Sequence, residues 1–205
     1  MAGAGAEVVV PFRTPREKLG IATRVRTTLL VSSLQSLRKR GLHDRYLELL
    51  PAEHHPVVRS MIAGQWVPMD VAEAHYDACE ALGIDRREVN AIGREVGDRI
   101  EGTFLATMVR MAGTVGATPW TALSYCDRLY DRIFAGGGGV CVYKLGPKDA
   151  EAHFVGVGVC RVPYFRGAMA GVFEVGAELF CAKAYAKEVP DAASSLGAVL
   201  HVAWA

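Results

Sequence analysis

Histidine and cysteine are the residues of this chain with the clearest capacity for metal chemistry. His75 and Cys79 are four residues apart, a spacing that places both on one helix face and would let both bind one metal ion. The same face carries several apolar residues, so we favour a buried histidine and thiol. A weaker alternative makes His75 an axial haem ligand, with Met108 or Met111 opposite, although methionines at helical spacing usually fill a core.

Motifs for other chemistries are absent from the sequence. It contains no G-x-S-x-G, no H-E-x-x-H and no Rossmann fingerprint. Glu174 and Glu178 are four residues apart, but we expect them on the solvated face of a helix. The glycines of residues 136–139 follow a predicted helix and precede a predicted strand, which is the reverse of a phosphate-binding loop. We therefore predict a helix stop and hinge there, and a protein that is not an enzyme.

A pocket for a small hydrophobic molecule has better support in the sequence. Large, flexible or amphipathic residues recur on the apolar faces of elements that we expect to converge, and ligand sites are mostly apolar with few polar anchors. An ordinary filled core has the same composition, so both interpretations stay open. The predicted lining residues are Trp66, Tyr76, Phe104, Met108, Met111, Trp120, Tyr130 and Phe173.

Three successive helices position most of these side chains. The longest opens at Asp85, where Asp85 and Glu88 have capping-box spacing, and its apolar residues recur every three or four positions over about seven turns. A second capping box at Asp70 opens the preceding helix, and Gly83 is expected to end it in a left-handed conformation. Thr118 and Pro119 begin a third helix, which we expect to run to Gly136.

Strands are predicted on both sides of this helical region. Residues 24–31 alternate between apolar and polar, which is typical of a half-buried strand. Beyond the glycines we expect two strands joined by a turn, a helix beginning at Pro163, and two more strands. The later strands are predicted at residues 140–144, 153–159, 181–189 and 198–204. This order predicts an α+β fold in which a helical layer packs on a small antiparallel sheet.

Composition limits the class of protein. The chain has 205 residues, 51% of them hydrophobic, and a net charge of +1, which fits one domain at residues 24–205 behind a flexible arm at residues 1–23. No apolar run is long enough to span a membrane, no signal peptide is apparent, and the five cysteines are scattered, so we expect a cytoplasmic protein with reduced thiols. Basic residues concentrate in residues 1–45, but without interleaved aromatic residues they do not predict nucleic-acid binding.

A combination of short motifs gives the chain a family likeness over residues 24–205. The motifs are Leu50-Pro51, Trp66-x-Pro68, Tyr76, Ile92-Gly93-x-x-x-Gly97, Tyr164-Phe165-Arg166-Gly167 and a final hairpin ending in Trp204. In order and spacing they resemble a large paralogous family of uncharacterised myxobacterial proteins of similar length. That family looks related to the 4-vinyl reductase domain, the haem–nitric-oxide-binding-like domains and the TRAPP vesicle-tethering subunits.

The resemblance implies a helical layer over a small sheet, frequent dimerisation and an internal pocket for a small hydrophobic molecule. Two departures matter. Zinc-containing relatives use a cysteine-rich site near the last hairpin, where this chain has only Cys181 and, on the final strand, His201. Haem–nitric-oxide sensors carry a Tyr-x-Ser-x-Arg motif that this sequence lacks. These departures argue against zinc and haem, and the sequence requires no cofactor.

Three hypotheses remain. The first is a cytoplasmic, homodimeric sensory module that binds a small hydrophobic molecule and signals through a protein partner. The second is a TRAPP-like interaction scaffold with a filled core. The third is a haem or metal sensor that uses His75, Cys79 or His201.

Overall fold

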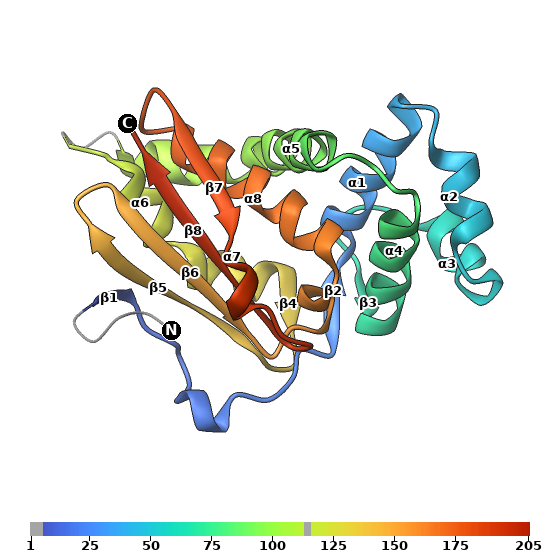
Figure 1. Cartoon of the computed structure of the whole chain (residues 1–205), viewed down its shortest axis with the longest axis horizontal. Helices are drawn as coiled ribbons and strands as arrows, with labels where there is room; N and C mark the ends of the chain where they lie inside the picture. Colours follow the sequence, from blue (N-terminus) through green and yellow to red (C-terminus); the bar gives the residue numbers. More distant parts are fainter. Residues whose placement is uncertain (1–5, 113–115) are drawn as a thin grey trace.

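Two antiparallel sheets and a layer of helices make up the computed structural model, which describes residues 6–112 and 116–205, with residues 101–112 described by their backbone alone (Figure 1). The larger sheet has the strand order β1-β5-β6-β8-β7. Its strands are β1 (Glu7–Val10), β5 (Gly139–Gly146), β6 (Asp149–Val155), β7 (Ala184–Glu188) and β8 (Gly197–Trp204). The prediction of an α+β fold with helices on an antiparallel sheet is confirmed.

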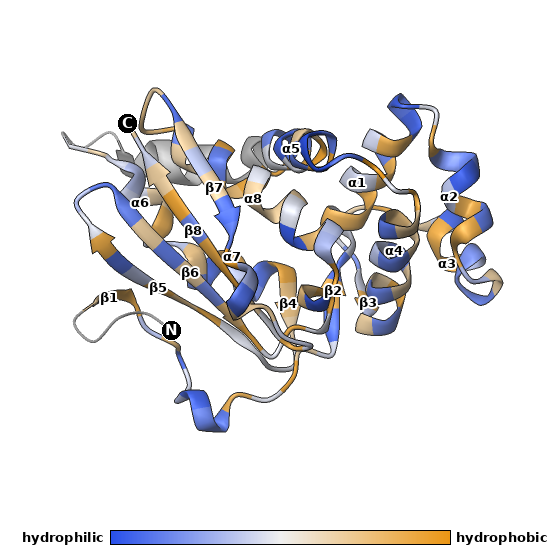
Figure 2. Ribbon diagram, in the orientation of Figure 1, coloured by the Kyte–Doolittle hydropathy of each residue, from blue (hydrophilic) through white to orange (hydrophobic). Residues whose placement is uncertain are grey.

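Helices cover one face of the large sheet. Along β6 every second residue is buried, with Ala150, Ala152 and Phe154 facing the core. This alternation is what a strand with one covered face requires. Against it pack α7 (Cys126–Ile133) on β5 and α8 (Pro163–Glu178) on β7 and β8. Figure 2 shows the result, since β8 is mostly apolar whereas the outlying helix α2 is largely hydrophilic.

A smaller sheet has the order β3-β2-β4 and corrects one sequence prediction. Its strands are β2 (Arg24–Arg26), β3 (Trp66–Pro68) and β4 (Phe134–Ala135). The strand predicted at residues 24–31 ends at Arg26, and helix α1 (Thr27–Lys39) begins directly after it. The alternation was ambiguous because Leu30, Leu34 and Leu37 also recur at helical spacing, and the longer pattern prevails.

The remaining helices follow the prediction more closely, apart from their caps. They are α2 (His43–Leu49), α3 (His55–Ser60), α4 (Met69–Ala81), α5 (Arg86–Ala112) and α6 (Pro119–Leu123). The long helix from Asp85 is confirmed as α5, and Gly83 has the left-handed φ of 65° expected of a helix end. The predicted helix after Thr118 is instead two helices, α6 and α7, followed by β4.

Capping was predicted correctly at one helix, partly at a second and wrongly at a third. Thr118 and Thr121 form a reciprocal capping box at the start of α6. Asp85 accepts a hydrogen bond from the Arg87 amide (2.8 Å), but the carboxylate of Glu88 binds Arg40, directly after α1, instead of closing the box. At α4 the box predicted at Asp70 was wrong, because the helix begins one residue earlier, at Met69. Tertiary contacts therefore override local capping patterns.

Helices α5 and α8 cross in direct backbone contact. A Cβ on Gly93 of α5 would lie 1.9 Å from the carbonyl oxygen of Ala168, and a Cβ on Gly171 of α8 would lie 2.3 Å from the carbonyl oxygen of Asn90. Glycine is therefore required at both positions, which confirms the close approach predicted from their spacing. On the outer side of the crossing, Arg94 binds Glu174 at 2.9 Å.

The described part of the N-terminal arm lies on the body of the protein. Strand β1 extends the large sheet by pairing with β5. Nearer the body, the amide of Gly138 donates to the carbonyl of Gly20 (2.9 Å), the amide of Ala22 donates to the carbonyl of Gly156 (2.8 Å), and the amide of Thr23 donates to the carbonyl of Ala135 (2.9 Å). Residues 20–23 thus share hydrogen bonds with the domain. None of the described helices is long and apolar enough to cross a membrane.

Candidate functional site

His75 lies at the centre of the helical region and is fully buried. Its Nδ1 is hydrogen-bonded to the Tyr46 hydroxyl at 2.8 Å, and its Nε2 lies 3.1 Å from the hydroxyl oxygen of Ser33 and 3.7 Å from the sulfur of Cys79. This arrangement fits a neutral imidazole, because each ring nitrogen faces a hydroxyl group that can either donate or accept a hydrogen bond. Burial lowers the pKa of His75 to about 3 and raises the pKa of the Cys79 thiol. Both residues thus lie in the core, the interpretation favoured from the sequence.

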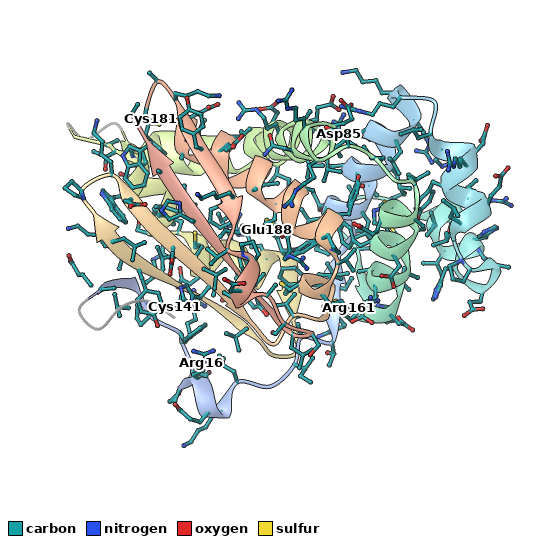
Figure 3. The ribbon with its side chains drawn as sticks, viewed as in Figure 1. Arg16, Asp85, Cys141, Arg161, Cys181 and Glu188 are labelled. Carbon is teal, nitrogen blue, oxygen red and sulfur yellow. The ribbon has the colours of Figure 1, made fainter. Side chains whose placement is uncertain are left out.

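Candidate metal ligands are not gathered together in the described residues. In those ranges no three or more His, Cys, Asp or Glu side chains could jointly hold an ion. His201 on β8 lies 2.5 Å from an oxygen of Asp149 on the neighbouring strand. All five cysteines are free thiols, and Cys141 and Cys181 lie in separate parts of the molecule (Figure 3).

The described side chains predicted to line a pocket lie in separate environments. Tyr76 packs edge-on against His75 and Phe165, at ring distances of 4.8 and 4.9 Å. Trp120 contacts Trp204 at 4.9 Å, and Phe173 contacts Phe154 at 6.0 Å.

Two further members of that set lie elsewhere. Trp66 on β3 is 36% exposed, and Tyr130 on α7 packs against Phe134 at 5.2 Å. The side chains of Phe104, Met108 and Met111 lie outside the described residues. The described members of the set therefore do not border one common cavity.

The space between α1, α4, α5 and α8 is almost completely filled. Side chains that include Ser33, Tyr76 and Tyr164 enclose a volume of about 20 Å³. A cavity needs roughly 10–15 Å³ to hold one water molecule, so this interior has room for about one. The glycine crossing of α5 and α8 explains the filling, because it brings the two backbones into contact.

A larger apolar cavity of about 380 Å³ opens where α1, α5 and α7 meet the turn before β3. Its volume lies in the range of small-molecule sites. Its described lining is mostly apolar, and none of its residues was among those predicted from the sequence to line a pocket. The lining residues are Arg26, Thr28, Leu29, Ala63, Gly64, Ile100, Arg132 and Ile133.

One wall of this apolar cavity is fixed by Thr27, the first residue of α1. Its hydroxyl donates to the carbonyl of Ile62 (2.7 Å) and accepts from the amide of Gln65 (2.9 Å), and its own amide donates to the Gln65 carbonyl (2.9 Å). Next to it, Nε of Arg26 donates to the carbonyl of Gly64 at 3.1 Å. These bonds hold the turn and the guanidinium at the cavity rim.

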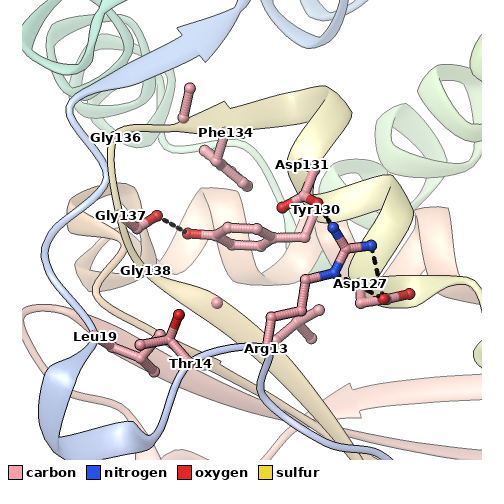
Figure 4. Close-up of a pocket in the computed structure, with 13 residues that line it drawn as sticks. Arg13, Thr14, Leu19, Asp127, Tyr130, Asp131, Phe134, Gly136, Gly137 and Gly138 are labelled. Atoms are coloured by element: carbon pink, nitrogen blue, oxygen red, sulfur yellow. Dashed lines mark hydrogen bonds and ion pairs between the residues drawn. The ribbon is translucent and has the colours of Figure 1, made fainter.

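A second pocket, of about 290 Å³, lies beside the glycine run (Figure 4). There the Tyr130 hydroxyl donates to the carbonyl of Gly137 (2.9 Å), and Arg13 from the arm binds Asp127 at 2.8 Å and also pairs with Asp131. The positive φ of Gly136, Gly137 and Gly138 lets the backbone pass close to the arm and to Tyr130. The glycines therefore serve packing, and the pocket's arginine is already paired with two carboxylates.

Comparison with solved structures identifies the fold. An Fe(II) unliganded H-NOX mutant from K. algicida matches with a TM-score of 0.62 and 7% identity, covering 88% of this chain and 96% of that one. An Fe(II) H-NOX mutant from S. oneidensis matches at 0.59 with 12% identity, covering 88% and 96%. An oxygen-binding H-NOX domain related to soluble guanylate cyclases matches at 0.55 with 13% identity, covering 87% and 94%. No protein-family model and no curated protein matches the sequence.

The chain therefore has an H-NOX-like fold, which confirms the haem–nitric-oxide-binding-like part of the resemblance. Identities this low establish the architecture alone, and a fold hosts different functions on different sites.

The described lining of the apolar cavity and the surroundings of His75 and Tyr130 do not fit a haem. Proteins bind haem iron through His, Cys, Met or Tyr, and none of these lines the described wall of the apolar cavity. His75 is enclosed on both ring nitrogens, and the filled interior around it has no space for a macrocycle. The Tyr130 hydroxyl donates a hydrogen bond to the Gly137 carbonyl. Burial raises the pKa of this hydroxyl and so disfavours the phenolate that would bind iron.

Proposed function

We propose that this protein is a non-catalytic, cytoplasmic sensory module that binds a small hydrophobic molecule in the apolar cavity and signals through a protein partner. The observation that carries the proposal is an open apolar cavity of about 380 Å³ at the junction of three elements of an H-NOX-like fold. A ligand that touches α1, α5 and α7 together can change their packing, and this change is what a partner would detect. We further propose that the module acts as a homodimer.

Two alternatives draw on other observations. The likeness to H-NOX domains favours a haem sensor. Against it, the ring nitrogen of His75, the candidate axial ligand, is already hydrogen-bonded inside the core. The filled interior between α1, α4, α5 and α8 favours a scaffold. The apolar cavity distinguishes our proposal from both alternatives. Its volume gives a ligand room that a scaffold does not need, and its described residues include no iron ligand for a haem.

An absorption spectrum of the purified protein, followed by mass spectrometry of what denaturation releases, tests the proposal. We expect no Soret band and a released hydrophobic compound. Ala63→Trp, at an exposed position of the cavity wall, should abolish that release by filling the opening. Ala52→Trp adds the same side chain at an exposed position that does not line the cavity and is the matched control. A Soret band would establish the haem alternative, and equal release from all three proteins would refute the cavity.

A further inference from the structure

The charge of the apolar cavity narrows the class of ligand. Two arginines, Arg26 and Arg132, belong to its described lining, and no acidic residue does. Arg132 already takes part in another interaction, so the argument rests on Arg26. The Nε of Arg26 donates to the Gly64 carbonyl, and no carboxylate among the described residues forms an ion pair with Arg26. Its two terminal nitrogens remain as a planar pair of donors, the geometry that suits a carboxylate.

The start of α1 adds a second electropositive feature to the same wall. Thr28 and Leu29 are the second and third residues of this helix, and both line the cavity. The first turn of α1 contains no acidic residue and its N-cap forms no side-chain hydrogen bond. The positive end of the helix dipole at this wall therefore favours an anion.

The ring of Trp66 holds the Arg26 guanidinium at the rim of the apolar cavity. On the paired strand β3, this ring lies 5.2 Å from the guanidinium carbon of Arg26 and 5.9 Å from that of Arg24. Stacking against an aromatic face restricts where the guanidinium can go and leaves its edge available for an acceptor. The anion-binding group is therefore pre-oriented beside an apolar volume.

We infer that the cavity binds a single-chain amphiphile, with its carboxylate on Arg26 and its hydrocarbon chain between Leu29, Ile100 and Ile133. This inference rests on the proposed function and specifies its ligand. An uncharged apolar molecule would leave Arg26 without a counter-charge at the rim, and a cationic one would be repelled by it.

Titration calorimetry with three twelve-carbon probes below their critical micelle concentrations tests the inference. The probes are dodecanoate, dodecanol and dodecyltrimethylammonium. We expect dodecanoate to bind at least about tenfold more tightly than dodecanol, the lower end of what a hydrogen bond to a charged group contributes. We expect the ammonium probe to bind most weakly. Shortening the acid should weaken binding by roughly fourfold per buried methylene.

Variants of Arg26 locate the head group. Arg26→Gln should weaken dodecanoate about tenfold and leave dodecanol unchanged. Arg26→Lys should retain part of the affinity because the charge remains, even if the glutamine variant is perturbed in fold. Arg24→Gln is the matched control, because Arg24 lies on the same strand and stacks on the same ring but does not line the cavity.

The outcomes separate the inference from the proposed function. Equal binding of dodecanoate and dodecanol, unaffected by Arg26→Gln, would overturn the carboxylate and leave a hydrophobic-ligand site intact. Binding to none of the probes, with no released compound from the purified protein, would overturn both. Binding to phosphatidylglycerol vesicles without binding to dodecanoate would replace the single-chain ligand with a membrane surface and so also overturn the inference.

Discussion

The crossing of α5 and α8 makes a quantitative prediction about stability. Gly93→Ala would place a methyl group 1.9 Å from the carbonyl oxygen and 2.7 Å from the Cα of Ala168, and both of these are backbone atoms of α8. Since real contacts of this kind stay above 3.0 Å, the helices must separate by about 1 Å. Overpacking of this kind costs about 1–3 kcal/mol, here at the upper end because backbone cannot rotate away, while alanine returns about 1 kcal/mol of helix propensity. We expect a net loss of about 2 kcal/mol.

Urea unfolding followed by far-UV circular dichroism measures this loss, and Tm should fall by roughly 4–8 °C. Gly176→Ala is the matched control on α8, because nothing lies within 4 Å of the Cβ position there. It should raise stability by up to about 1 kcal/mol through helix propensity alone. If Gly93→Ala were as stable as the unaltered protein while Gly176→Ala behaved as expected, the inferred backbone contact, and with it the filled interior, would be wrong.

Four further predictions rest on burial and hydrogen bonding. The pKa of His75 is about 3 in the folded protein, against the ordinary value of 6.5. Below pH 6.5 the unfolded chain therefore binds a proton at His75 that the folded chain does not bind. The free energy of unfolding should therefore fall by up to about 1.4 kcal/mol per pH unit from about pH 6.5 to 5, and His75→Gln should flatten that slope in urea titrations. Deleting residues 1–12 removes β1 and exposes the edge of β5, so size-exclusion chromatography should show self-association. Deleting residues 1–23 also removes backbone hydrogen bonds to the body, each contributing about 1 kcal/mol, so equal stability of the two truncations would contradict the attachment. Cys181 should react first with a maleimide in the folded protein, because the other four thiols are buried; mass spectrometry of the labelled peptides decides.

The sequence predicted best the elements whose pattern is long and local. Helix α5 runs for 27 residues, so its 3.6-residue period could not be mistaken for a strand. Two strands joined by a Gly-Pro turn were also predicted, and β5 does pair with β6, but β6 spans Asp149–Val155 and not the predicted residues 153–159. The stretch at residues 24–31 is too short for that discrimination, and its conformation depends on Thr27 meeting Gln65, which no local pattern contains.

The site was harder to predict than the fold for the same reason. Aromatic side chains such as Tyr76 and Trp120 can be predicted to pack in the interior. Their burial does not indicate which of them border the same cavity. The apolar cavity is lined instead by small and aliphatic residues such as Ala63 and Ile133, which carry no chemical signal in the sequence. The one available clue was Arg26, a cation next to a helix start that has no acidic residue in its first turn.

The central helix crossing and the apolar cavity of this protein are built largely from different elements. Helix α8 joins the two halves of this fold, because it packs on β7 and β8 and also crosses α5 in backbone contact at Gly93 and Gly171. The same crossing fills the interior next to His75, so we propose that the ligand binds where α8 does not reach. The apolar cavity meets this condition, because its described lining comes from α1, α5, α7 and the turn before β3. The crossing and the apolar cavity share only α5, so we expect a variant that loosens the crossing to lower the stability of the fold before it alters binding to Arg26.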